Sequence, residues 1–146
     1  MLEAMYASDL DRLAQLEDGW NNGEGYAMPK PLLEFARGFF VELVRRNPKM
    51  ARADYAPDIT PCFRGGIDIV WCELRVYVYL ARDGDLFIDA FLDHEWNRAK
   101  LSWNNPEASG WCFVWIEWYI AQAEHLAKQK KMTLDDKLAN LSLNES

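Results

Sequence analysis

The sequence predicts an α+β fold with two N-terminal helices, a four-stranded antiparallel meander and a long C-terminal helix packed on one sheet face. Three features lead to this prediction. Residues 31–45 carry apolar side chains at helical spacing, residues 59–91 contain four short segments rich in β-branched and aromatic residues, and residues 111–120 are apolar almost all round. A chain of 146 residues is the usual size of one domain. We therefore expect a single domain over residues 1–131, followed by a helical turn and a frayed tail over residues 132–146.

The first two helices are expected over residues 9–17 and 31–45. Ser8 is a typical N-cap residue, and Asp11 lies three positions later, where a capping box places an acid. Pro31 suits the first turn of the second helix. The apolar face of that helix follows the i, i+3, i+4 rule through Leu32, Leu33, Ala36, Phe39, Phe40, Leu43 and Val44.

Four strands are expected between short turns, over residues 59–63, 67–71, 74–81 and 85–91. In the third of these, aliphatic side chains alternate with arginine and tyrosine, so one face of the sheet is aliphatic. The helical and strand faces together predict one core that contains Ile67, Ile69, Val76, Val78, Leu80, Phe39, Leu43 and Ile116.

The C-terminal third is expected to begin irregularly and then become helical. Residues 92–110 show no clear period, whereas residues 107–131 form a long helical pattern that ends in lysines. Thr133 and Asp136 then predict one more capped turn, after which the last residues fray.

The charge of the chain limits its partners. The formal net charge is −7 and the isoelectric point is near 4.8, so the Lys and Arg excess that binds phosphates is lacking and we expect no direct nucleic-acid binding. Residues 67–95 hold seven acids against two arginines. Asp85, Asp89 and Asp93 are therefore candidates for docking on a basic partner surface. The alternative is a solvated sheet face that serves solubility.

The absence of a signal-peptide pattern, of a membrane-span pattern and of a CxxC motif bears on the cellular location. The N-terminus has neither the basic nor the apolar region of a signal peptide. The longest apolar stretch, residues 111–120, is far shorter than the roughly 20 residues of a membrane span. Cys62, Cys72 and Cys112 fit no CxxC pattern, so reduced thiols are expected. These features favour a cytoplasmic protein without a membrane partner.

The sequence offers one candidate metal site. Asp93, His94 and Glu95, with His125 further along, carry ligand types that suit zinc or manganese, which makes a metal-dependent enzyme one alternative. Their spacing is not that of HExxH, and the sequence contains no G-x-S-x-G, P-loop or G-x-G-x-x-G motif. We therefore expect a protein that is not an enzyme, with no catalytic residue, resident metal or cofactor.

The glycine-rich segment 18–26 predicts an irregular loop. Its polar and aromatic side chains would form a ligand lip if they converged, the candidates being Asp18, Trp20, Asn21 and Glu24. A structural role is the stronger interpretation, because glycines permit positive φ angles and an aspartate can hold turn amides.

This loop and the hairpin that follows resemble a known sequence pattern. The loop contains Asp18-Gly19-Trp20-Asn21-x-Gly23 with Gly25 and Pro29, and the hairpin contains Pro61-x-x-x-Gly65-Gly66-Ile67-x-Ile69-x-Trp71. Over residues 10–90 the chain resembles a family of small, mostly uncharacterised bacterial and phage-borne proteins with a DGW(D/N)xG…P loop. The resemblance implies a shared fold over that range and identifies no catalytic residue.

Function is inferred from an excess of tryptophan. A helix on a sheet buries one stripe, whereas residues 111–120 are apolar around the whole circumference. At least one of Trp111, Trp115 and Trp118, together with Trp96 or Trp103, is therefore expected in an exposed or interfacial patch.

Such a patch predicts an acidic, non-enzymatic protein-binding module, for example an antitoxin, a phage inhibitor or a complex subunit, that uses the tryptophans and the acidic sheet region. The alternative is a sensor that stacks a small ligand or nucleotide on tryptophan. Homodimerisation through the C-terminal helix is compatible with both.

Overall fold

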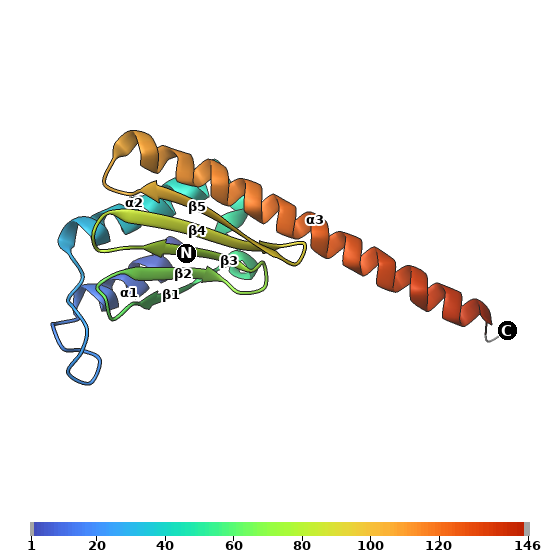
Figure 1. Cartoon of the computed structure of the whole chain (residues 1–146), viewed down its shortest axis with the longest axis horizontal. Helices are drawn as coiled ribbons and strands as arrows, with labels where there is room; N and C mark the ends of the chain where they lie inside the picture. Colours follow the sequence, from blue (N-terminus) through green and yellow to red (C-terminus); the bar gives the residue numbers. More distant parts are fainter. Residues whose placement is uncertain (1, 145–146) are drawn as a thin grey trace.

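A five-stranded antiparallel sheet and three helices make up the fold (Figure 1). The computed structural model describes the backbone of residues 2–144 and the side chains of residues 6–132 and 134–139. The helices are α1 (Leu2–Ala14), α2 (Lys30–Arg46) and α3 (Pro106–Asn144), and two short 3₁₀ turns, η1 (Pro48–Ala51) and η2 (Ala53–Tyr55), follow α2. The strands are β1 (Asp58–Pro61), β2 (Ile67–Trp71), β3 (Val76–Leu80), β4 (Asp85–Leu92) and β5 (Glu95–Ser102). They pair in chain order as a meander, which confirms the predicted α+β class and antiparallel sheet.

One face of this sheet is aliphatic and buried. The register aligns one buried residue from each strand in a row across the sheet, namely Ile59, Ile69, Val78, Ile88 and Ala99. Their neighbours along each strand point to the other face and stay partly exposed, since successive side chains alternate. The helices therefore have one apolar face to cover.

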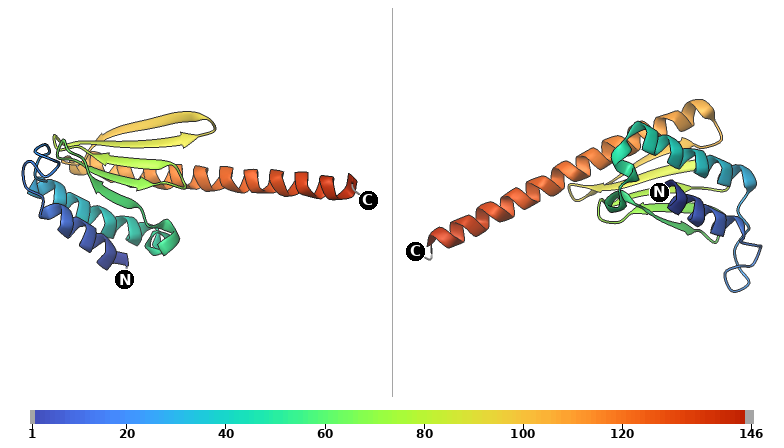
Figure 2. Two further views of the ribbon diagram at one scale, coloured as in Figure 1. Left: turned by 90° about the horizontal axis from the view of Figure 1, so that it is seen from below. Right: turned by 180° about the vertical axis from the view of Figure 1, so that it is seen from behind.

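Helices α1 and α2 lie together on one side of the sheet (Figure 2). Helix α1 packs on α2 through Tyr6, whose ring stacks on Phe40 with centroids 4.5 Å apart. Helix α2 in turn buries Phe39, which stacks on Phe113 of α3 at 5.5 Å. All eight residues predicted for the core are buried in one cluster, so that prediction is confirmed.

The prediction of an irregular segment over residues 92–110 is wrong for residues 92–102, which form the end of β4, a turn and all of β5. Asp93 and His94 both have positive φ angles, 49° and 67°, which is the geometry of a two-residue hairpin turn. Within β5 only Ala99 is buried. An edge strand of this kind shows no apolar alternation, which is why its sequence did not predict a strand.

The bounds of helices α1 and α3 also differ from prediction, and α1 ends at Ala14 rather than residue 17. Helix α1 begins at Leu2 rather than residue 9, because Tyr6, Leu10 and Leu13 form its buried stripe and Ser8 lies within it instead of capping it. Helix α3 runs without a break to Asn144, so the separate turn predicted at Thr133 is part of the same helix. No glycine or proline occurs between residues 111 and 144 to end it. Residues 145–146 of the predicted tail lie outside the described residues.

The central row yields a stability prediction. Ile69 is fully buried between β1 and β3, so Ile69→Ala removes buried methyl groups and leaves a cavity. We expect the free energy of unfolding to fall by about 2–5 kcal/mol in urea denaturation. Val41→Ala on the exposed side of α2 is the control and should cost less than about 0.5 kcal/mol. Equal losses in the two variants would show that the buried face is assigned wrongly.

Candidate protein-binding surface

Helix α3 is held to the body of the protein by one stripe of its circumference. Its buried side chains are Cys112, Phe113, Ile116, Tyr119 and Ile120. The Phe113 ring lies between Phe39 and the guanidinium of Arg46, whose carbon is 5.3 Å from the ring centroid. The helix is therefore clamped from α2 as well as from the sheet, and its rotation about its own axis is fixed.

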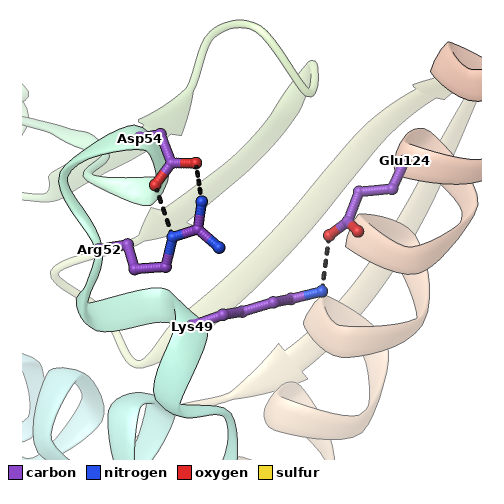
Figure 3. Close-up of polar contacts among 4 residues, drawn as sticks. All are labelled: Lys49, Arg52, Asp54 and Glu124. Carbon is purple, nitrogen blue, oxygen red and sulfur yellow. Dashed lines mark hydrogen bonds and ion pairs between the residues drawn. The ribbon is translucent and has the colours of Figure 1, made fainter.

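A polar contact adds to this clamp near the edge of the body (Figure 3). Lys49 Nζ in η1 donates to Glu124 Oε1 of α3 at 2.7 Å, and both side chains are about one-third exposed or less. An ion pair in this setting contributes on the order of 1 kcal/mol or less. Its main effect is to set where α3 leaves the body.

Three tryptophans lie on a part of α3 that the body does not cover. Trp111, Trp115 and Trp118 are spaced i, i+4, i+7 and have 61%, 40% and 50% of their surface exposed. Trp115 and Trp118 meet edge to face with centroids 6.4 Å apart, and Val114 is exposed beside them. We call Trp111, Val114, Trp115 and Trp118 the tryptophan stripe. The expected exposure of these tryptophans is thus confirmed, and Val114 is a member that sequence reasoning missed.

The other two candidate tryptophans do not extend this stripe. Trp103 is buried, its Nε1 donates to the carbonyl of Ala81 at 2.6 Å, and its ring lies 5.9 Å from that of Phe35, so its assignment to an exposed patch was wrong. Trp96 is 63% exposed but belongs to β5, where it packs against Tyr77 and Phe91 instead.

The three candidate acids have different surroundings. Asp89 accepts two hydrogen bonds from Arg98, at 2.6 and 2.9 Å, and Asp85 lies 3.9 Å from Lys100. Asp93 is exposed in the β4–β5 turn. Both cations belong to β5, the strand that the sequence did not reveal. The acidic sheet region is therefore partly neutralised and offers less attraction to a basic partner than its composition suggested.

The outward face of the sheet carries aromatic rings, which we call the aromatic sheet face: Tyr77, Tyr79, Phe87, Phe91 and Trp96. Cations lie over several of these rings. Arg75 is 5.1 Å from the Phe91 centroid and Arg98 is 4.9 Å from that of Phe87. The alternation of Phe87, Asp89 and Phe91 with buried neighbours was the sequence feature that could have revealed this face.

The glycine-rich loop is organised by its own hydrogen bonds. Asp18 Oδ1 accepts from the backbone N–H of Ala27 at 2.9 Å, and Trp20 Nε1 donates to the carbonyl of Tyr26 at 3.0 Å. Asn21 and Glu24 pair through their backbones. Gly25 has a φ of 101° and lies so close to the Trp20 ring that no β-carbon fits there. These four candidate residues therefore close the loop, in line with the structural interpretation.

The histidines and cysteines are dispersed. His94 lies in the β4–β5 turn and His125 is exposed on α3. Among the described residues, no group of three or more His, Cys, Asp or Glu side chains is placed to hold a metal ion.

Cys112 is buried, and burial raises the pKa of its thiol to about 12. Cys72 is exposed and donates to Asp58 Oδ2 at 3.6 Å, and desolvation followed by that hydrogen bond raises its pKa as well. Neither thiol has the lowered pKa of a nucleophile.

The Cys112 thiol gives a test of burial that has a definite pH dependence. An unfolded thiol ionises near pH 9, whereas the folded thiol keeps its proton to about pH 12, so the unfolded state binds fewer protons between these values. The free energy of unfolding should therefore fall as pH rises through that range, and fall less in Cys112→Ala. In native protein at pH 8, iodoacetamide followed by mass spectrometry should label Cys72 well before Cys112. Equal labelling rates would contradict the packing described.

Comparison of the chain with protein-family profiles, with curated proteins and with solved structures finds no match. The resemblance of the loop and hairpin to a phage-borne family therefore stays a prediction. None of the described helices combines the length and the apolar character needed to cross a membrane.

Proposed function

We propose that this chain is a non-enzymatic protein-binding module that presents the tryptophan stripe of α3 to a protein partner. The observation that carries the proposal is the exposure of three tryptophans in consecutive turns of a helix whose other side is packed. Tryptophan is the residue most enriched at binding hot spots, and monomers rarely leave such a group uncovered without a function.

The size of the stripe indicates what kind of contact it can make. A fully covered aromatic side chain buries about 150–250 Å². Multiplied by the exposed fractions of the three tryptophans, this gives roughly 200–400 Å² of exposed tryptophan surface. Covering that area is worth on the order of 5–10 kcal/mol. Association costs about 4–15 kcal/mol in lost freedom, so the stripe alone would bind weakly at best. The partner must therefore also contact polar surface around the stripe.

The charge of the chain favours a partner with a basic surface. The net charge of −7 persists although Asp85 and Asp89 are paired, so long-range attraction to a cationic protein is retained. An antitoxin, a phage-encoded inhibitor and an acidic subunit of a complex all fit this description. Electrostatic attraction of this kind acts mainly on the association rate and weakens as salt is added.

The aromatic sheet face supports a second candidate, a small-ligand or nucleotide sensor. Trp96 is exposed at the edge of this face, and Arg75 lies over the adjacent Phe91 ring. An aromatic platform beside a guanidinium can stack a base and attract a phosphate. The sequence alone argued against this because the chain as a whole is acidic. The pairing of β5 with β4 brings Arg98 and Lys100 to the same face, but each lies beside an aspartate. Arg75 forms no ion pair among the described residues, so it is the cation best placed to attract a phosphate.

The primary proposal predicts a selective effect of tryptophan removal. Wild-type chain and Trp115→Ala would be used as baits in the native host, and captured proteins would be re-measured with purified components by calorimetry. We expect Trp115→Ala to weaken association by about 2 kcal/mol or more, as at a hot spot, while the melting temperature stays near that of wild type. Met132→Ala, which changes an exposed residue outside the stripe, is the matched control. Unchanged affinity in Trp115→Ala would remove the main support for the proposal.

The second candidate predicts a different response. Nucleoside monophosphates would be titrated into labelled protein while the Trp96 indole N–H resonance is followed by NMR. A sensor that stacks its ligand on Trp96 should show saturable shifts that disappear in Trp96→Leu. Shifts that do not saturate, or that survive in Trp96→Leu, would exclude this site as the place of binding.

A further inference from the structure

The described side chains in the last part of α3 lie outside the core of the chain. Leu126 still packs against the core, whereas every described side chain from Ala127 to Ala139 is exposed. Residues 127–144 extend about 27 Å at 1.5 Å per residue, and Figure 1 shows this part projecting past the sheet. A lone helix of this length is marginal in water, because most helical stability in proteins comes from packing of an apolar face.

The projecting part nevertheless carries an apolar face. Leu134 and Leu138 are 57% and 55% exposed and continue the same helical face that Ile116 and Ile120 bury in the core. We call Leu126, Leu134 and Leu138 the leucine stripe. Leu134 and Leu138 lie about a third of a turn or more around α3 from the tryptophan stripe, and Leu126 lies about 16 Å along the axis from Trp115, so the two are separate surfaces.

A groove accompanies the leucine stripe where α3 leaves the body. Two hollows of about 450 and 460 Å³ adjoin there and share Asp93, Leu126 and Lys130. The first is closed by the β2–β3 and β4–β5 turns, with Glu73, Leu74 and His94. The second runs along α3 past Leu134 and Lys137. The groove therefore has an apolar floor, with Glu73, Arg75 and Asp93 on the turns and lysines on the helix.

The two parts of the chain have opposite charge. Residues 127–144 contain four lysines and two aspartates, a formal charge of +2. Because the net charge of the whole chain is −7, the rest of the chain carries a formal charge of −9. Within the described residues, Glu73 and Asp93 on the turns and Lys130 and Lys137 on the helix form no ion pair. A basic helix end thus projects from an acidic body. Glu73 and Asp93 form no ion pair among the described residues, although Arg75, which lies over the Phe91 ring, lines the same hollow.

We propose that a second copy of this chain occupies the groove, with the two α3 helices antiparallel. The leucine stripe of each copy would lie in the groove of the other, and the lysines of each helix end would face Glu73 and Asp93 of the partner copy. Parallel pairing would instead bring the lysine-rich ends together. Both grooves and both helix ends would bury on the order of 1,000 Å² in total, near the lower limit for specific interfaces.

This dimer does not depend on the proposed function. The tryptophan stripe lies on another part of α3 and would stay exposed in both copies, so the assembly would present two stripes to partners. Loss of partner binding without loss of the dimer, or the reverse, distinguishes failure of one idea from failure of the other.

The first test is the mass of the full chain by light scattering after size exclusion. Wild type should be a dimer at micromolar concentration, and Leu134→Asp with Leu138→Asp should be a monomer that retains its near-UV circular dichroism. Met132→Asp adds a charge to the same helix end away from the leucine stripe and should remain a dimer. A monomeric wild type, or a dimer that survives both leucine substitutions, would overturn the proposal.

Charge reversal tests the assigned orientation. Lys130→Glu with Lys137→Glu should weaken self-association at least tenfold, and Glu73→Lys with Asp93→Lys should do the same, because each places like charges together. An equimolar mixture of these two variants restores opposite charges at both contacts, so it should form a heterodimer at wild-type strength. If the mixture associates no better than either variant alone, the antiparallel arrangement is wrong.

Discussion

The structure depends on the sheet having only one aliphatic face. The row from Ile59 to Ala99 aligns a buried side chain from every strand, and Phe39 of α2 and Phe113 of α3 meet in the same core. The opposite face is built from tyrosine, phenylalanine, aspartate and arginine, which can remain partly in water because the cations and the rings cover one another. All burial of helices is therefore confined to one side.

This constraint accounts for the surfaces that α3 presents. Since α2 and the sheet take up a single stripe of the helix, the core does not cover the residues a third of a turn away, and Trp111, Trp115 and Trp118 occupy those positions. The helix is also longer than the sheet, so the buried stripe continues beyond the edge as Leu134 and Leu138. The Lys49–Glu124 contact lies close to the point where the packed part of α3 ends and its exposed part begins. One helix thus supplies the anchor, a candidate partner surface and a candidate self-association surface.

The predictable part of the fold was the part determined by local periodicity. Alternation around Val76 and Val78 and the helical spacing around Phe39 were sufficient to place the core. Strand β5 was not predicted, because its pairing with β4 is specified by the Asp93–His94 turn and by non-local partners rather than by an apolar pattern. Exposure of the α3 tryptophans followed from helix geometry. Burial of Trp103 involves the Phe35 ring and the carbonyl of Ala81, which are distant in sequence, so no local pattern reveals it. The neutralisation of Asp89 by Arg98 was missed for the same reason.

The central claim is that the body of the protein covers one stripe of α3 and leaves the tryptophan stripe to solvent. Its most direct test is the relaxation of assigned indole N–H resonances by a soluble paramagnetic agent in the isolated chain. The account predicts strong relaxation for Trp111, Trp115 and Trp118 and weak relaxation for Trp71 and Trp103, which are buried and donate to backbone carbonyls. Protection of all three α3 tryptophans to the level of Trp103 would contradict it.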